Sequence, residues 1–326
     1  MSETLVITCP SGKQCSRLIP LLYNQGKFHL RLAAHSDSSA RKLQSDYPDA
    51  EVVTIDLQSA PDCRKLLHRA TAIHAVLPSL HSHEKEIGFN LIDAAVTESR
   101  REGNVFQHFV LSSVLGTQHR SLLQHDLKSY VEERLFLSPL DCWTVLKPTN
   151  FLDVYPVAEL AAQENPVLER WWNPEHANSV IALADLAEAS AKVLNERERH
   201  YLAEYPLCST MPISETEVVR IIERRIGKKI ELTMPSFETG VNRLIRVLYS
   251  GEEEKKKKKK KKGHGELGLG LATEGDLRGD LVRDGAERLI LFYNRRGLKG
   301  SPNVLRWLLE REPTSVQQWV DNAALR

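Results

Sequence analysis

Short apolar runs alternate with segments of helical spacing over the first 150 residues. Residues 5–7 form the first apolar run, whose β-branched members predict a buried strand. Gly12 follows in a turn of small residues, and Leu18, Ile19 and Leu22 then recur at helical spacing. Five more strands are predicted at residues 29–34, 51–56, 72–77, 106–113 and 141–148. This alternation predicts an α/β fold with a doubly wound parallel sheet and right-handed crossovers.

The pattern loosens from residue 153 onward. A helix with an alanine-rich face is predicted at residues 181–194, and a strand follows at residues 200–207. A helix is predicted at residues 214–226 and a strand at residues 229–233, and the remaining helices lie near residues 277–293, near residues 303–311 and after Thr314. The sequence therefore predicts a main domain over residues 1–152 and a smaller α+β C-terminal region over residues 153–326. We expect that second region to form a substrate pocket.

The turn around Gly12 has the character of a phosphate site. The first N–H groups of a helix are unpaired, and the helix dipole favours an anion there. In the Thr-Gly-x-x-Gly-x-x-Gly pattern of short-chain dehydrogenases, read from Thr8, only Gly12 is kept, and Cys9 and Cys15 hold the other glycine positions. A positive φ at Cys9 would be strained because of its Cβ atom. The alternative interpretation is an ordinary strand-to-helix connection.

Polar residues gather at the predicted ends of several strands. Ligands of doubly wound sheets bind at the carboxyl ends of the strands, where Gly12, His35, Asp56, Pro78 and Ser112 all fall. This coincidence favours a Rossmann-like, NAD(P)-binding domain. Within its first predicted helix stands Pro20, which should kink or shorten that helix unless packing compensates.

Charge and cysteine content narrow the class of protein. The chain has 326 residues and a net charge of +1, but eight lysines stand in one run at residues 255–262. Without them, 36 of the 44 basic residues remain against 43 acidic ones, a net charge of −7 that gives no support to nucleic-acid binding. Five cysteines without a Cys-x-x-Cys pair argue against a disulfide framework or a structural zinc.

The sequence also allows an expectation about the compartment of the protein and two interpretations of the lysine run. A strand this close to Met1 leaves no room for a signal peptide, and no apolar run could span a membrane, so we expect a cytoplasmic protein. We interpret residues 250–272, which include the lysine run, as a flexible low-complexity insertion on the surface. The alternative is a nuclear-import signal.

Six stretches of the chain carry a resemblance to one family: residues 6–14, 109–114, 125–132, 146–151, 293–297 and 302–309. They resemble the NmrA-like family, atypical members of the short-chain dehydrogenase/reductase superfamily. Residues 6–14 resemble the family's Gly-Ala-Thr-Gly-Lys-Gln-Gly turn, and residues 109–114 are similar to its fifth strand. Residues 125–132 resemble its His-x-x-Lys-x-x-Val-Glu helix. Residues 146–151 resemble its Arg-Pro-x-x-Phe exit from the sheet. The segments 293–297 and 302–309 are close to the tails of fungal members.

The resemblance implies an extended Rossmann fold that binds NADP(H). By position it implies that residues 8–14 hold the pyrophosphate, that Asp56 and Leu57 flank the adenine, and that Lys128 reaches the nicotinamide ribose. The full set of expected cofactor-binding residues is Thr8, Pro10, Ser11, Gly12, Lys13, Gln14, His35, Arg41, Asp56, Leu57, Leu77, Pro78, Lys128, Thr149, Asn150 and Phe151.

Hydride transfer also needs a group that supplies a proton. The usual Tyr-x-x-x-Lys pair is incomplete here, because Gln124 stands four residues before Lys128. As catalytic candidates we name Lys128, whose ammonium would hold ribose hydroxyls, and His125 and Ser112 as proton donors. Lys128 could instead be a solvent-facing helix lysine, and His125 an ordinary residue at a helix start.

The choice of cofactor depends on the turn after the second strand. An acid at the strand end would favour NAD, but His35 stands there, with Arg41 shortly after and Asp37 between them. His35 and Arg41 suit a 2′-phosphate, so we expect NADP(H) rather than NAD(H), with an ordinary polar loop as the alternative.

A pair of histidines next to two glutamates invites a metal interpretation. His81 and His83 precede Glu84 and Glu86, but two histidines two apart do not converge on one ion without further ligands. We therefore expect a solvated loop and no metal.

Two hypotheses about function remain. The first is an oxidoreductase that uses NADPH to reduce a small aromatic, quinone or polyketide-type carbonyl in secondary metabolism. The second is a catalytically silent NADP(H)-sensing transcriptional regulator that binds a partner protein. The missing tyrosine favours the second, whereas Trp171, Trp172, Phe237 and Trp307 favour a pocket for a small-molecule substrate and hence the first. Neither hypothesis involves a membrane or nucleic acid.

Overall fold

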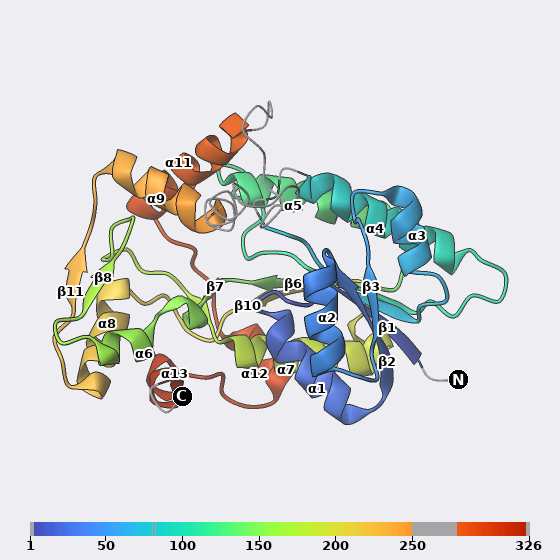
Figure 1. The fold of residues 1–326 in the computed structure, drawn as a ribbon, viewed down its shortest axis with the longest axis horizontal. Coiled ribbons are helices and arrows are strands. Elements are labelled where there is room, and N and C mark those ends of the chain that lie inside the picture. The colour runs from blue at the N-terminus through green and yellow to red at the C-terminus, as the bar shows by residue number, and fades with distance from the viewer. Residues whose placement is uncertain (1–2, 80, 82, 250–278, 324–326) are drawn as a thin grey trace, which may run out of the picture.

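A computed structural model describes residues 3–79, 81, 83–249 and 279–323 (Figure 1). Seven strands form one parallel sheet in the order β10-β6-β5-β4-β1-β2-β3. Strands β2 and β3 are added on one side of β1, and β4, β5 and β6 are added on its other side, so the strand order reverses between β1 and β4. This reversal is typical of doubly wound folds, and the predicted fold class is confirmed. The strands are β1 (Glu3–Thr8), β2 (Phe28–Ala34), β3 (Glu51–Thr54), β4 (Ala72–Val76), β5 (His108–Ser112), β6 (Trp143–Pro148) and β10 (Ala203–Leu207).

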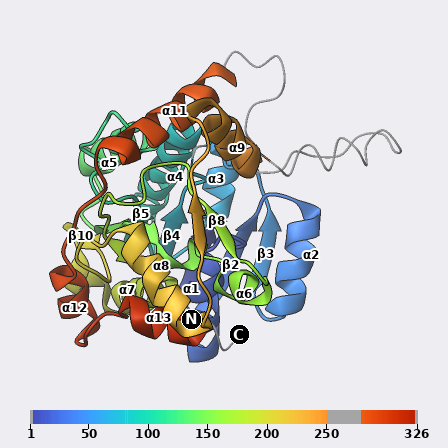
Figure 2. The same cartoon turned by 90° about the vertical axis from the view of Figure 1, so that its left-hand side faces the viewer.

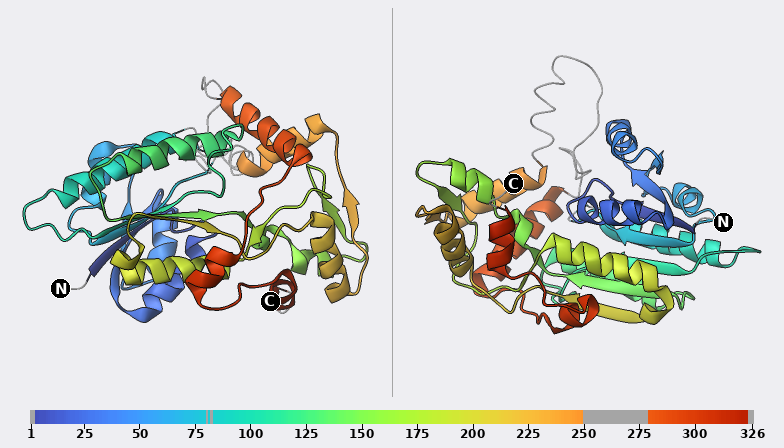
Figure 3. Two further views of the ribbon diagram at one scale, coloured as in Figure 1. Left: turned by 180° about the vertical axis from the view of Figure 1, so that it is seen from behind. Right: turned by 90° about the horizontal axis from the view of Figure 1, so that it is seen from below.

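Helices cover both faces of the sheet because its central strands are apolar on both sides. In β1, Leu5 and Ile7 enter one core cluster and Val6 enters the other. The first cluster includes residues of α1 (Cys15–Gln25), α2 (Asp37–Asp46) and α7 (Leu183–Glu196), and the second includes residues of α3 (Ala60–Leu66), α4 (Glu84–Ser99) and α5 (Leu123–Phe136). Figure 3 shows from behind that α4 and α5 lie on the opposite side of the sheet from α7.

The C-terminal region forms a smaller unit at one end of the molecule, and Figure 2 views the molecule from that end. Two short parallel strand pairs join β7 to β9 and β8 to β11. The remaining elements are β7 (Asn150–Phe151), η1 (Leu152–Val154), α6 (Val157–Ala162), β8 (Val167–Glu169), β9 (Val180–Ile181), η2 (Arg197–His200), α8 (Glu215–Ile226), β11 (Glu231–Thr233), α9 (Phe237–Tyr249), α11 (Gly279–Arg295), α12 (Asn303–Leu309) and α13 (Val316–Ala323).

The chain returns to the main sheet after residue 152. Helix α7 packs on α1, and β10 pairs with β6 as the last strand of the sheet. The predicted boundary at residue 152 thus marks the exit from β6, while later segments complete the main layers. The predicted insertion at residues 250–272 lies outside the described residues.

Helix α1 is not shortened at Pro20, because packing compensates for the proline. Helix α1 runs through Pro20 to Gln25 and ends at Gly26, which adopts a left-handed conformation with φ 65°. Leu18, Ile19 and Leu22 are buried against the sheet and α7, and this packing holds the helix together despite the missing N–H of the proline.

Candidate functional site

The turn between β1 and α1 closes tightly around Gly12. The Gly12 amide donates a hydrogen bond to the Cys9 carbonyl at 2.9 Å, and a Cβ atom on Gly12 would lie only 3.1 Å from that oxygen. Cys9 itself has φ 49°, so the positive φ that the sequence anticipated there is present in a residue with a side chain. Such a conformation costs about 1–2 kcal/mol outside glycine. The turn therefore needs glycine at residue 12 and tolerates strain at residue 9.

The start of α1 presents donors without partners. In the part of the chain that the structure describes, no side chain caps α1, and the backbone N–H groups of Lys13, Gln14 and Cys15 donate no hydrogen bond. Ser11 and Lys13 are exposed beside them. Unpaired N–H groups at the positive end of a helix dipole attract an anion. This arrangement can hold a phosphate.

The side chains around the turn connect it to neighbouring strands. Thr8 is buried, and its hydroxyl donates to the Val76 carbonyl at 2.7 Å and accepts from the Val76 amide at 2.8 Å, so it links β1 to β4. Ser112 Oγ donates to Gln14 Oε1 at 2.9 Å and links the end of β5 to the turn. Pro10 is also buried. Thr8, Gln14 and Ser112 thus hold the turn in place through their side chains.

The ends of β2 and β3 present an open polar surface. His35 and Arg41 are exposed, and Ser36 caps α2 by accepting from the Ser39 amide. Ser39 also shares a hydrogen bond of 2.7 Å with Ser11, which brings the first turn of α2 against the β1–α1 turn. The structure therefore brings His35 and the predicted phosphate turn to the same edge of the sheet.

The segment after β3 contains the two residues expected beside the adenine. Asp56 is exposed, and its Oδ1 accepts from the Gln58 amide at 2.9 Å. Leu57 is half-buried, and its carbonyl accepts from Asn90 Nδ2 at 3.2 Å. Both lie at the carboxyl end of the sheet, as the sequence predicted.

Lys128 lies in a buried ion pair. Its ammonium contacts the carboxylate of Glu84, in the first turn of α4, and both residues are almost fully buried. The interpretation of Lys128 as a solvent-facing helix lysine is wrong. Sequence reasoning missed Glu84 as its partner, although the first turn of the helix after β4 is a favourable place for an acid. Burial raises the pKa of the nearby Cys9 thiol to about 12, with the charge of Lys128 acting in the opposite direction.

His125 is buried in the first turn of α5, as a neutral base. Its Nδ1 lies 2.8 Å from the Gly116 carbonyl, and burial lowers its pKa to about 4. A carbonyl only accepts, so Nδ1 carries the proton and Nε2 carries the lone pair. At neutral pH this arrangement lets His125 accept a proton at Nε2 but does not make it a proton donor there.

The segment after β6 is fixed by contacts from the C-terminal region. Thr149 Oγ1 donates to the Ser179 carbonyl at 3.0 Å, and Tyr293, from α11, donates to Asn150 Oδ1 at 2.9 Å. Phe151 is half-buried in β7. Tyr293 was not among the residues that the sequence predicted for this site, because nothing local signals a contact across so many residues.

Two predicted positions follow β4. Leu77 is buried, and Pro78 is half-buried and accepts from the His81 amide at 3.1 Å. His81 Nδ1 in turn accepts from the His83 amide at 3.0 Å, so this ring organises its own loop. Within the described residues, no three His, Cys, Asp or Glu side chains are grouped to hold a metal ion.

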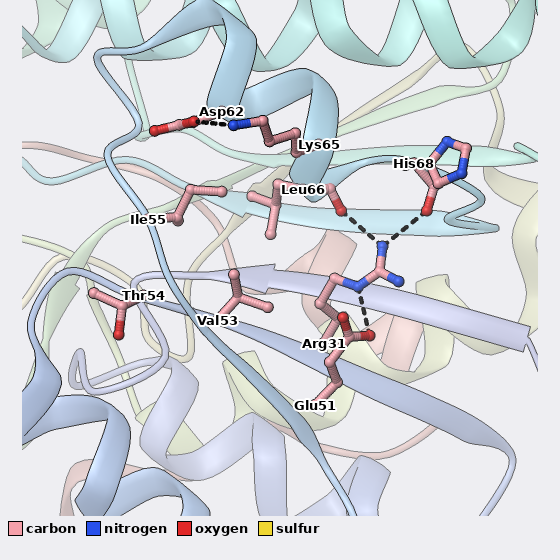
Figure 4. Close-up of a pocket in the computed structure, with 9 residues that line it drawn as sticks. All are labelled: Arg31, Glu51, Val53, Thr54, Ile55, Asp62, Lys65, Leu66 and His68. Carbon is pink, nitrogen blue, oxygen red and sulfur yellow. Dashed lines mark hydrogen bonds and ion pairs between the residues drawn. The ribbon is translucent and has the colours of Figure 1, made fainter.

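A separate pocket lies between α3 and the β2–β3 edge of the sheet (Figure 4). Its volume is about 370 Å³. The guanidinium of Arg31 stands in it and donates to the Leu66 and His68 carbonyls and to Glu51, at 2.7 to 2.9 Å. None of the predicted site residues lines this pocket. The remaining lining residues are Val53, Thr54, Ile55, Asp62 and Lys65.

The fold and the turn define the class of protein: a doubly wound α/β protein with unpaired backbone N–H groups at the start of its first helix. A model of the NmrA-like family matches residues 1–259, and the chain belongs to this family. No curated protein sequence matches the chain. In the part that the structure describes, no helix is long and apolar enough to cross a membrane.

Solved structures of similar fold include two reductases and a regulator. An NADPH-dependent quinone oxidoreductase from Escherichia coli, complexed with NADPH, is 16% identical with a TM-score of 0.71 and covers 98% of this chain and 99% of its own. The triphenylmethane reductase of Citrobacter sp., complexed with NADP(H), is 15% identical with a TM-score of 0.72 and the same coverage. NmrA, a negative transcriptional regulator in complex with NAD, is 14% identical with a TM-score of 0.70 and covers 98% and 95%. Such low identities establish the fold alone.

Proposed function

We propose that the chain binds a nicotinamide dinucleotide along the carboxyl edge of its sheet, with the pyrophosphate at the start of α1. The unbonded N–H groups of Lys13, Gln14 and Cys15 carry this proposal, because they are donors that a phosphate would satisfy. His35 and Asp56 would lie toward the adenosine half. Residues 149–151 would lie toward the nicotinamide half. The complexes of similar fold with NADPH, NADP(H) and NAD support this proposal.

We propose NADP(H) as the preferred dinucleotide. His35 and Arg41 are both exposed near the end of β2, where a 2′-phosphate would lie. The carboxylate of Asp37, which stands between them in the sequence, accepts a hydrogen bond from Thr54 Oγ1 at 3.3 Å. A preference for NADPH over NADH that Arg41→Glu reverses would support this choice, and equal affinity of the wild type for both would contradict it.

The role that the geometry supports best is nucleotide sensing without turnover, coupled to a partner protein. Each catalytic candidate already has a partner inside the protein. Lys128 pairs with Glu84, Ser112 donates to Gln14, and His125 donates from Nδ1 to Gly116. The tyrosine that would supply a proton is replaced by Gln124. The ion pair between Lys128 and Glu84 is the observation on which this role depends.

A reductase is the second candidate, and the aromatic residues near Asn150 favour it. Trp172 stacks on Tyr293 with ring centroids 4.9 Å apart, and Phe292 lies 5.5 Å from Tyr293. A small aromatic or quinone substrate would find apolar surroundings there. Two of the similar solved structures are reductases, which fits this candidate.

Two measurements on the purified protein separate these functions. Tryptophan fluorescence is titrated with NADPH and with NADH, and NADPH oxidation is then followed with a panel of quinones. Saturable binding without oxidation supports the sensor. Steady oxidation supports the reductase, and absence of binding would contradict both. Gly12→Val serves as the binding-deficient control in each measurement.

A further inference from the structure

The side-chain carboxamide of Asn150 accepts a hydrogen bond at its oxygen but donates none from its nitrogen among the described residues. The Tyr293 hydroxyl donates to Asn150 Oδ1 at 2.9 Å. Among the described residues, Asn150 Nδ2 donates no hydrogen bond, and the atom remains accessible to solvent although the residue is half-buried. A carboxamide carries one acceptor oxygen and two N–H donors, so both donors of this side chain are available to water or to a ligand.

Tyr293 is held firmly in the orientation that makes this contact. It is almost fully buried, and its ring stacks on Trp172 with an interplanar angle of 27°. Trp172 Nε1 donates to Glu215 Oε1 at 3.0 Å, and Glu215 pairs with Arg170 at 2.7 Å. Burial raises the pKa of Tyr293, so its hydroxyl stays protonated. A protonated hydroxyl can donate, and here it donates to the carbonyl oxygen of Asn150, which turns the NH₂ group of that side chain away from Tyr293.

The contact lies at the β5–β6 side of the carboxyl edge. Asn150 comes two residues after the end of β6, and Leu115, three residues after the end of β5, packs in one cluster with Tyr293. The β1–α1 turn and His35 lie toward the other side of the sheet order. A dinucleotide with its pyrophosphate at α1 would bring its nicotinamide half, not its adenine, to this side.

We propose that Tyr293 is a positioning residue that orients the Asn150 carboxamide, so that its N–H groups donate to the carboxamide oxygen of the nicotinamide ring of the dinucleotide. This inference depends on the proposed dinucleotide binding but not on turnover. It adds to that site a residue from α11, far along the chain from every predicted site motif.

The test compares two ligands that differ only in the nicotinamide ring. Wild type, Tyr293→Phe and Asn150→Ala are titrated with NADPH and with 2′-phospho-ADP-ribose. Loss of one oriented hydrogen bond should weaken NADPH binding by about fivefold in both variants, with the affinity for 2′-phospho-ADP-ribose unchanged. The double variant should lose no more than Asn150→Ala alone, because both substitutions remove the same interaction.

Tyr155→Phe is the matched control. Tyr155 is also a buried tyrosine of the C-terminal region, but it contacts Arg170, whose guanidinium lies over its ring at 4.4 Å, and makes no hydrogen bond to Asn150. Its NADPH affinity should equal that of the wild type. Thermal melting of each variant shows whether it is folded.

Three results would overturn the inference. These are equal weakening of both ligands by Tyr293→Phe, no weakening of either, and additive losses in the double variant. If wild type binds 2′-phospho-ADP-ribose and NADPH while Tyr293→Phe behaves like wild type, only the role of Tyr293 fails. If wild type binds neither, the dinucleotide proposal fails with it.

Discussion

The two halves of the carboxyl edge of the sheet differ in how their polar groups are satisfied. Around the β1–α1 turn, the backbone N–H groups of Lys13, Gln14 and Cys15 have no partner in the described structure, and Ser11 and Lys13 are exposed. At the ends of β5 and β6, by contrast, Ser112, His125 and Lys128 all bond to other groups of the protein. The β1–α1 half therefore offers free backbone donors, while the polar side chains of the β5–β6 half are largely bonded to other groups of the protein.

This difference indicates that one half of the edge is suited to bind a ligand and that the other half is less suited to catalysis. A backbone donor without a partner can serve a ligand at no loss to the fold, whereas a side chain that is already paired must give up its partner first. The β1–α1 half is thus suited to hold a phosphate. The β5–β6 half is suited to stabilise the protein, with the Asn150 carboxamide as the exception. Substitutions in the β1–α1 half should consequently change the affinity for NADPH, whereas substitutions in the β5–β6 half should change the free energy of unfolding.

The largest expected effect follows removal of the partner of Lys128. Glu84→Leu leaves the ammonium buried without a counter-charge, which should lower the free energy of unfolding by about 3–5 kcal/mol in urea denaturation. The control is Asp93→Ala, which breaks the exposed pair with Arg134 and should cost less than about 1 kcal/mol. If Glu84→Leu is as stable as this control, the ion pair does not stabilise the β5–β6 half.

A second effect should appear in acid. Because the folded pKa of His125 is about 4, below its ordinary value near 6.5, the unfolded chain binds a proton there before the folded chain does. Stability from this residue is complete above pH 6.5 and falls by roughly 1.4 kcal/mol per pH unit as pH drops toward 4.

The variant His125→Asn tests this pH dependence. Asparagine keeps an N–H donor for the Gly116 carbonyl but cannot be protonated. Between pH 6 and pH 4 the wild type should lose about 2 kcal/mol more stability than the variant, measured by urea denaturation at each pH. Parallel pH profiles for the two proteins would contradict the neutral, buried state of His125.

A smaller effect, on binding rather than stability, is expected at the turn. Gly12→Val places side-chain carbon close to the Cys9 carbonyl and should weaken NADPH binding at least about tenfold, or about 1.4 kcal/mol. Gly240→Ala is the control, because its Cβ would make only ordinary contacts of 3.6 Å and longer, away from the turn. Equal affinities of the two variants would remove the turn from the binding site.

The smallest effect is expected at Cys9. Cys9→Gly relieves the left-handed strain of about 1–2 kcal/mol but adds backbone entropy of about 0.5–1 kcal/mol to the unfolded chain and removes a packed thiol. Stability should therefore change by less than about 1 kcal/mol, and NADPH affinity should not fall. A clear loss of affinity would show that the thiol itself contributes to the site.

The local sequence pattern was enough to predict the fold and the tight turn between β1 and α1. Apolar runs with β-branched residues mark strands, and helical spacing between them marks crossover helices, so the doubly wound sheet follows from spacing alone. The turn at Gly12 also depends only on residues within one strand–helix connection. At Pro20 only the tertiary structure showed the compensation, since packing of Leu18, Ile19 and Leu22 outweighs the missing N–H.

The partners of the buried polar groups were decided by the tertiary structure alone. Lys128 and Glu84 are 44 positions apart, and Tyr293 and Asn150 are 143 positions apart. Apolar periodicity shows which face of an element is buried, but it does not show which polar atom of another element will meet it there. That choice depends on how α4, α5 and α11 dock on the sheet, because a hydrogen bond or ion pair requires atoms to approach within about 3 Å in a defined direction. The sequence alone thus determined the sheet and its β1–α1 turn, and the docking of distant elements decided which candidate side chains remain available to a ligand.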